Sequence, residues 1–267
     1  MSDSKHRAAN ALAPTLQFER HDAVGVLRLS RPHKRNALDD ATIGGIEDFF
    51  SGLPDHIKAV VIHGEGEHFC AGLDLSDLAE RDIAAGIAHS RAWHRAFERL
   101  EFGRAPVVAV LHGAVVGGGL ELAAACHIRV AERSAYYALP EGSRGIFLGG
   151  GGSVRLPRLI GTARVVDMML TGRTYGADEG GPLGFSQYVV EAGAGLAKAI
   201  ELAGRIVGNA PMTNFAAMHV LPHNAEQDRA SGLVMEALMA AIAQADPQAK
   251  RRLRDFLAKR APKTVHR

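Results

Sequence analysis

Short apolar runs, bounded by polar turns and glycines, dominate the first two thirds of the chain. Residues 24–29 (V-G-V-L-R-L) alternate in character, which predicts a strand. Residues 59–63 and 106–111 are rich in β-branched side chains, as is typical of buried parallel strands. Shorter strands are predicted at residues 128–131, 135–139 and 188–190.

Helical spacing of apolar positions lies between these runs. In residues 37–53 one helical face carries Ile43, Ile46, Phe49 and Phe50. Further helices are predicted for residues 76–100, 117–126, 154–170, 196–207, 214–219, 227–243 and 248–259. Strand–helix repeats followed by a helical C-terminal third predict an α/β core at residues 14–194 and a helical region at residues 195–267.

Composition and charge narrow the possible functions. The 31 basic and 29 acidic residues give a net charge of +2, which does not favour nucleic-acid or membrane binding. The start of the chain lacks the apolar run of a signal peptide, so we expect a cytoplasmic protein. Cys70 and Cys126 form no C-x-x-C pair and are expected to be reduced and packed. No metal site is predicted, because the histidines are scattered and no H-E-x-x-H motif occurs.

Three glycines precede a predicted helix at residues 117–126 (G-G-G-L-E-L-A-A-A-C). Amides at a helix start have no partner within the helix and can bind an anion or a developing oxyanion. The string fits neither the dinucleotide-binding fingerprint nor a P-loop. Close packing of the helix on a strand is an equally good explanation of the glycines alone.

Two glutamates stand in apolar surroundings, Glu121 in G-L-E-L-A and Glu141 in A-L-P-E-G. Burial raises the pKa of a carboxyl group, and a second carboxylate nearby raises it further. Such groups can exchange protons near neutral pH. Either one alone is better explained as a satisfied buried polar residue, whereas the pair favours function.

The loop at residues 69–75 (F-C-A-G-L-D-L) is a second tight turn with free amides. Ala71 and Gly72 form the turn, and Asp74 follows just before a predicted helix. Taken alone, Asp74 is interpreted as a helix cap.

Several segments together resemble the crotonase, or enoyl-CoA hydratase/isomerase, superfamily over roughly residues 15–260. The segments are R-P-H-K-R-N-A-L from Arg31, H-F-C-A-G-L-D-L, P-V-V-A-V-L-H-G-A-V-V-G-G-G-L-E-L-A, A-L-P-E-G-S-R-G-I-F-L-G-G-G-G and R-L-I-G. The resemblance implies a spiral of ββα units with a C-terminal helical trimerisation region, and a trimer or a dimer of trimers. It also implies an acyl-CoA substrate and no cofactor, since coenzyme A is part of the substrate.

The resemblance assigns roles to residues. The backbone amides of Leu73 and Gly118 match the pair that holds the thioester oxygen. Family hydratases carry two glutamates 20 positions apart, as Glu121 and Glu141 stand here. Glu121 would activate water for the β-carbon, and Glu141 would hold that water and deliver a proton to the α-carbon. The positions matching CoA and substrate contacts are Lys34, Arg35, Ala37, Ala71, Gly72, Asp74, Leu75, Gly117 and Gly119. Lys34 and Arg35 could neutralise CoA phosphates or simply form a solvated basic loop.

Two departures from the family pattern point to an unusual acyl group. Leu73 is larger than the residue often found there, and the glycine run at residues 149–152 lacks a preceding proline. Length, glutamate positions and A-L-P-E-G-S-R-G-I look like the hydratases of methylthioacryloyl-CoA. A general short-chain enoyl-CoA hydratase is the nearest alternative, followed by an isomerase or a thioester hydrolase. From another class, an inactive or RNA-binding homologue is disfavoured by the two glutamates and the low net charge.

Overall fold

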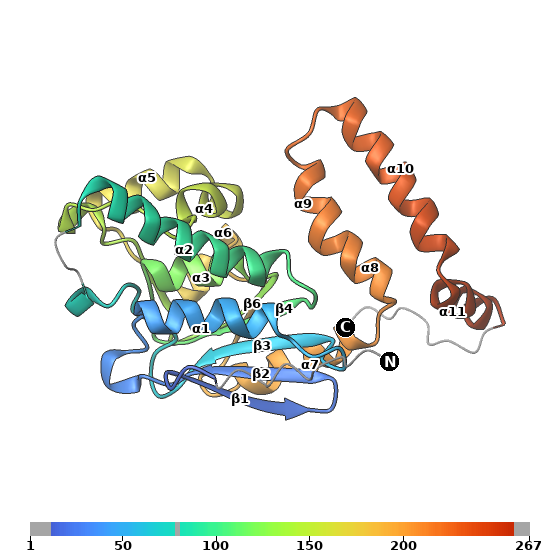
Figure 1. Ribbon diagram of the computed structural model, residues 1–267, viewed down its shortest axis with the longest axis horizontal. Coiled ribbons are helices and arrows are strands. Elements are labelled where there is room, and N and C mark those ends of the chain that lie inside the picture. The colour runs from blue at the N-terminus through green and yellow to red at the C-terminus, as the bar shows by residue number, and fades with distance from the viewer. Residues whose placement is uncertain (1–11, 78–80, 259–267) are drawn as a thin grey trace, which may run out of the picture. The chain divides into compact units, whose positions relative to one another are not determined.

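The computed structural model describes residues 12–77 and 81–258, and the protein is shown in Figure 1. The described chain forms two compact units. The first ends at Val207 and the second begins at Gly208.

A six-stranded sheet with the order β1-β2-β3-β4-β6-β9 is the centre of the first unit. Its strands are β1 (Leu16–His21), β2 (Val24–Leu29), β3 (Ala59–Gly64), β4 (Val107–Leu111), β6 (Ile128–Glu132) and β9 (Tyr188–Val190). All neighbours are parallel except β1 and β2, which form an antiparallel hairpin. The apolar runs therefore predicted five of these strands. β1 carries too few apolar residues to be found this way, because only Leu16 among its residues is buried.

A second, three-stranded sheet lies beside the first. It consists of β5 (Ala114–Val116), β7 (Tyr136–Ala138) and β8 (Tyr175–Gly176). β5 continues from β4 after a two-residue break, and α3 (Gly118–Ala125) follows it directly. The predicted strand at residues 135–139 is confirmed as β7, and its end leads into Glu141.

Helices cover both faces of the large sheet (Figure 1). One core joins the sheet to α1 (Asp40–Ser51), α2 (Ile83–Glu101) and α3 through residues such as Ile62, Phe97 and Leu120. A second core joins the opposite face to α7 (Gly195–Val207) through Val61, Val108 and Leu202. Full burial of a side chain of this size contributes roughly 1.5–3 kcal/mol, so both cores stabilise the sheet that carries the site.

The helix boundaries correct the sequence analysis at three points. The helix predicted for residues 76–100 begins only at Ile83, where the Asp82 side chain accepts a hydrogen bond from the Ala85 amide. The helix predicted for residues 154–170 is two helices, α4 (Gly152–Ile160) and α5 (Thr162–Thr171), because Gly161 has a φ of +83°. α7 was placed in the C-terminal region, but it packs on the sheet and belongs to the first unit. The remaining helix of this unit is α6 (Ala177–Leu183).

The second unit is helical, as the spacing predicted. It contains α8 (Pro211–Phe215), a π-helical turn (Ala216–Val220), α9 (Leu221–Asn224), α10 (Arg229–Ala245) and α11 (Pro247–Leu257). The side chains of Asp228 and Asp246 cap α10 and α11. Along α10 the apolar side chains of Leu233, Val234, Leu238 and Ile242 are exposed. None of the helices in the described parts of the chain is long and apolar enough to cross a membrane.

Candidate active site

The entry to α3 is a turn that only glycine adopts easily. Gly117 has a φ of +52°, and its amide donates to the carbonyl of Ala138 at 2.9 Å. Gly118 is then the first residue of a helix whose eight residues are all buried. Within residues 12–77 and 81–258, no group accepts a hydrogen bond from the Gly118 amide. The predicted glycine-to-helix entry is therefore present, with an unpaired amide at its tip.

A second unpaired amide lies on the loop after β3. The neighbouring amides of Ala71 and Asp74 donate to the carbonyls of Arg35 and Leu38, both at 2.9 Å. No acceptor in the described parts of the chain pairs with the amide of Leu73, which lies between them. A methyl group placed on Gly118 would lie 3.4 Å from the Leu73 nitrogen, so the two unpaired amides are close together. Two such donors can hold one oxygen atom as negative charge develops on it.

Glu121 lies one helical turn after Gly118 and is only 3% exposed. Its Oε1 accepts hydrogen bonds from the amides of Gly150 at 2.9 Å and Gly152 at 2.7 Å. Loss of hydration raises the pKa of Glu121 to about 7, and the Glu141 charge raises it as well, against the lowering effect of the two amides and Arg155. Glu121 therefore exists in both protonation states near neutral pH.

Glu141 follows β7 and is 6% exposed. Its Oε1 would lie 2.6 Å from a methyl group on Gly117, so the missing side chain there makes room for it. Among the described residues, nothing forms a hydrogen bond with its Oε2. Burial raises the pKa of Glu141, and the nearby Arg144 opposes this only in part. The structure thus brings two proton-exchanging carboxyl groups to the turn that carries Gly118.

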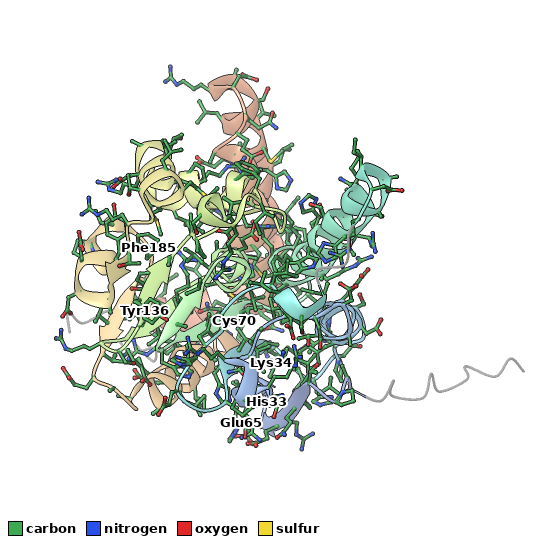
Figure 2. All side chains as sticks on the ribbon, turned by 90° about the vertical axis from the view of Figure 1, so that its left-hand side faces the viewer. His33, Lys34, Glu65, Cys70, Tyr136 and Phe185 are labelled. Carbon is green, nitrogen blue, oxygen red and sulfur yellow. The ribbon has the colours of Figure 1, made fainter. Side chains whose placement is uncertain are left out.

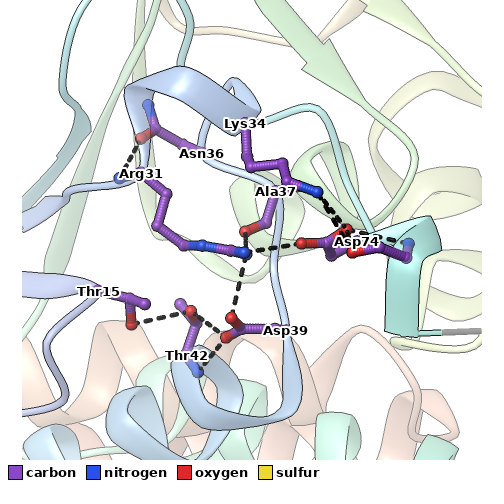
Figure 3. A network of polar contacts seen from close by, with 9 residues as sticks. Thr15, Arg31, Lys34, Asn36, Ala37, Asp39, Thr42 and Asp74 are labelled. Atoms are coloured by element: carbon purple, nitrogen blue, oxygen red, sulfur yellow. Dashed lines mark hydrogen bonds and ion pairs between the residues drawn. The ribbon is translucent and has the colours of Figure 1, made fainter.

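A third buried carboxylate, Asp74, has very different partners (Figure 3). It accepts hydrogen bonds from the Arg31 guanidinium at 2.7 Å and from the Ser76 hydroxyl at 2.6 Å, and Lys34 Nζ lies 3.7 Å away. Its bond from the Ser76 amide caps the turn η2 (Leu75–Asp77), as the simpler interpretation of Asp74 predicted. The Ser76 hydroxyl and Arg31 hold the pKa of Asp74 well below its usual range. Asp74 is therefore permanently ionised and orders the loop.

Comparison with known proteins identifies the family. The sequence pattern of the enoyl-CoA hydratase/isomerase family matches residues 19–266. The chain belongs to this family. A Mycobacterium bovis protein assigned as an enoyl-CoA hydratase is 32% identical over 255 residues, which are 95% of this chain and 98% of the relative. The 2,3-dehydroadipyl-CoA hydratase of Escherichia coli is 31% identical over 249 residues, covering 92% and 97% of the two chains.

Solved structures agree with this family. A Rhodopseudomonas palustris protein assigned as an enoyl-CoA hydratase superposes with a TM-score of 0.90 and 58% identity, covering 92% of this chain and 95% of that one. The predicted fold class, an α/β crotonase spiral followed by C-terminal helices, is confirmed by these neighbours.

The residues that match the family's CoA contacts fall into two groups. Ala71, Gly72, Gly117 and Gly119 surround the unpaired amides, and a methyl group on Gly72 would lie 3.0 Å from the Gly118 nitrogen. The others lie on the loops nearby: Lys34, Arg35 and Leu75 are exposed, whereas Ala37 is buried and Asp74 holds Arg31. Exposed cations beside the site are available to CoA phosphates, and this role of Lys34 and Arg35 stays a prediction.

Several residues that form the site were not predicted from the sequence. Gly150 and Gly152, which bind Glu121, were considered only as part of a glycine run that lacks a preceding proline, without a link to Glu121. The Trp93 ring packs against the same region: a methyl group on Gly118 would lie 2.6 Å from its Cζ3. Beside them Cys70 is buried among packed side chains (Figure 2), and burial raises the pKa of its thiol to about 12. The glycine run itself was the only signal that could have pointed to Gly150 and Gly152.

Proposed function

We propose that the protein is an enoyl-CoA hydratase, which adds water across the α,β double bond of an acyl-CoA thioester without a further cofactor. One observation carries this proposal. Two buried carboxyl groups with raised pKa, Glu121 and Glu141, lie beside two unpaired amides, those of Leu73 and Gly118. Proton donors and acceptors next to an oxyanion site are what hydration of an enoyl thioester requires.

In the direction of hydration, each of these groups has one role. The Leu73 and Gly118 amides donate hydrogen bonds to the thioester carbonyl oxygen and stabilise the negative charge that forms there as the enolate. The ionised Glu121 takes a proton from water while the water oxygen bonds to the β-carbon. The protonated Glu141 delivers its proton to the α-carbon, and the two carboxyl groups exchange protons with solvent before the next cycle.

Methylthioacryloyl-CoA is the substrate that we propose for this site, because the segment around Glu141 resembles hydratases of that thioester. Water added to the carbon that bears sulfur forms a hemithioacetal, which releases methanethiol and leaves an aldehyde. Hydrolysis of the thioester then gives free CoA and a 3-oxo acid, which loses carbon dioxide to form acetaldehyde. These reaction steps belong to the degradation of dimethylsulfoniopropionate. The alternative is that the protein is a general short-chain enoyl-CoA hydratase.

We also propose that the chain assembles as a trimer or a dimer of trimers. The exposed apolar side chains of α10, among them Val234 and Leu238, support this because such a face is costly in water. Light scattering coupled to size-exclusion chromatography measures the mass directly. A monomer at micromolar concentration would contradict the proposed assembly.

A panel of acyl-CoAs tests the function. Crotonyl-CoA, methylthioacryloyl-CoA and longer enoyl-CoAs are incubated with the protein, and enone absorbance, methanethiol and free CoA are measured together. Loss of absorbance with CoA retained indicates hydration, and release of methanethiol with free CoA indicates the specialised substrate. Glu98→Gln is the control for substitutions of the two glutamates of the site. Glu98 is an exposed residue of α2, and this variant should hydrate thioesters as the unchanged protein does. If no thioester loses its double bond, the proposed function is wrong.

A further inference from the structure

The glycine loop at residues 149–152 is held from two sides. On its inner side the amides of Gly150 and Gly152 donate to Glu121 Oε1. On its outer side two carbonyl oxygens accept hydrogen bonds from side chains. The Ser90 hydroxyl on α2 donates to the Gly149 carbonyl at 2.5 Å, and Arg155 Nη1 on α4 donates to the Gly150 carbonyl at 3.1 Å.

Ser90 acts on the same peptide unit that binds Glu121. The carbonyl of Gly149 and the amide N–H of Gly150 belong to one planar group, so a donor on the carbonyl fixes the direction of the N–H. It also polarises the peptide and strengthens the bond that the N–H makes. His94 Nε2 lies 3.4 Å from the Ser90 oxygen.

Arg155 is itself fixed by an ion pair. Its Nε and Nη2 lie 2.7 and 2.6 Å from one carboxylate oxygen of Glu101, at the end of α2. The side chains of Arg155 and Glu101 are only 12% and 23% exposed, so the pair is shielded from solvent. The guanidinium is therefore a fixed positive charge near Glu121, one peptide away from its carboxylate.

We propose that Ser90 and Arg155 are positioning residues for Glu121, acting through the backbone of the loop at residues 149–152. The proposal rests on the proposed role of Glu121 as the base. The hydroxyl holds the Gly149 carbonyl outward, so that the Gly150 amide of the same peptide stays aimed at Glu121, and the guanidinium holds the next carbonyl of the loop, that of Gly150. Both also favour the ionised form of Glu121, one through the amide that it orients and the other through its charge.

The other charged groups around Glu121 act in known directions. Glu141 raises the pKa of Glu121, and the charge of Arg144 lowers the pKa of Glu141. His94 has a pKa below its usual value because of burial and the charges of Arg91 and Arg155, so it is neutral at pH 7. The carboxylate of Glu101 forms an ion pair with Arg155. Arg155 is thus the cation that counters the burial of Glu121.

The pH dependence of kcat tests the proposal. In Ser90→Ala and in the charge-balanced double variant Glu101→Gln/Arg155→Met, we expect the acidic limb of the profile to move to higher pH. The expected shift of the acidic limb is roughly half a pH unit for Ser90→Ala and about one pH unit for the double variant. We expect kcat at pH 7 to fall about threefold in Ser90→Ala and about thirtyfold in the double variant. KM should stay nearly constant, because a misaligned carboxylate affects the chemical step. Arg155→Lys should recover part of the shift.

Arg158→Met is the matched control, since Arg158 is an exposed residue of the same helix and donates to the Val154 carbonyl. Arg158→Met should leave the pH dependence of kcat unchanged. A purely structural role of Ser90 and Arg155 would lower the melting temperature and the active fraction without moving the acidic limb, and that result would overturn the proposal.

A second readout separates this proposal from the proposed function. The carboxyl band of Glu121 is followed by infrared titration and identified by its absence in Glu121→Gln. A band that titrates at higher pH in the double variant supports positioning even if no thioester is hydrated, in which case the function alone fails. Hydration by the unchanged protein, with a band that titrates identically in all variants, refutes the positioning role.

Discussion

Asp74 and Glu121 are both buried carboxylates, 4% and 3% exposed, and they differ in what touches them. Asp74 pairs with the Arg31 guanidinium at 2.7 Å and with the Ser76 hydroxyl. Within the described part of the chain, Glu121 accepts hydrogen bonds from two backbone amides, and Arg155, the cation whose charge acts on it, is engaged by Glu101. The pKa of Asp74 is held well below its usual range, whereas that of Glu121 is raised to about 7.

The difference shows that burial alone does not decide the charge of a carboxyl group. At Asp74 the Ser76 hydroxyl, the Arg31 guanidinium and the Lys34 charge together outweigh the loss of hydration, whereas at Glu121 the two amides and the charge of Arg155 do not. Asp74 is therefore locked as an anion that orders a loop. Glu121 keeps a proton affinity near neutral pH, which a base needs if it is to take and return protons.

The largest effect should come from removing the titrating group. Glu121→Gln retains an oxygen that can accept from Gly150 and Gly152 but cannot take a proton, so kcat should fall on the order of 10³-fold. Asp74→Asn should change kcat far less and should mainly lower the free energy of unfolding. Rates are measured with the best thioester of the panel, together with circular dichroism to verify the fold. If the Glu121→Gln protein is folded and still hydrates the thioester at a near-normal rate, the contrast between Glu121 and Asp74 is wrong.

Arg31→Met should give the largest loss of stability. It leaves the buried Asp74 charge without its main cation, and removing one partner of a buried pair costs about 3 kcal/mol. Asp74 contributes this stability above its unfolded pKa of 3.8 and loses it as pH falls. Urea denaturation should therefore show the full difference between Arg31→Met and the unchanged protein at pH 7 and a smaller difference at pH 3, because the contribution disappears only as pH falls through the lowered pKa of folded Asp74.

Arg95→Met is the matched control for that variant. Arg95 lies 3.5 Å from Glu47 in an exposed pair on the surface of α1 and α2. Such pairs contribute about 0–1 kcal/mol, so this variant should unfold almost as the unchanged protein does. If Arg31→Met and Arg95→Met lose the same free energy of unfolding, the burial of Asp74 does not increase the contribution of its ion pair to stability.

Gly152→Ala should displace the base while keeping every functional group. The added methyl would lie 2.7 Å from Glu121 Cγ, and the carboxylate must move. A displacement of about 1 Å can cost roughly 10²-fold in rate. Gly204→Ala on α7 is the control, since nothing lies within 4 Å of its methyl. Steady-state kinetics of both variants test this, and equal rates would rule out a steric role of Gly152.

The smallest expected effect is a gain in stability. Glu121 ionises more easily in the unfolded chain, so its burial costs stability as pH rises from its usual pKa of 4.5 through about 7. Glu121→Gln removes this cost and should raise the free energy of unfolding at pH 8 by up to about 3 kcal/mol. At pH 4.5 the two proteins should be equally stable. A variant that is less stable than the unchanged protein at pH 8 would show that Glu121 is not strained by burial.

Local signals predicted much of this architecture. β-branched runs mark β3 and β4 because both faces of these strands are buried, and the glycines before Glu121 mark the entry to α3. The edge strand β1 was missed because most of its side chains face water. Gly161 divides the helix predicted for residues 154–170, since its positive φ cannot be seen in the apolar spacing.

The site was predicted where its chemistry is local and missed where it is built from distant segments. Glu121, Gly118 and Glu141 could be selected from their immediate neighbours. The partnership of Arg31 with Asp74 joins residues 43 positions apart, and that of Gly152 with Glu121 joins residues 31 positions apart. Contacts over such separations depend on the folded sheet, so the sequence around either partner carries no sign of them.

The two amides on Glu121 have a consequence for the handedness of the product. Both donate to Oε1, so this oxygen is fixed and the carboxylate cannot exchange its two oxygens by rotation. We therefore expect Oε2 to be the atom that faces reactants and to approach a bound substrate from one direction only. Water activated by this oxygen reaches one face of the double bond. We therefore expect a prochiral enoyl thioester to yield a single enantiomer of the 3-hydroxy product.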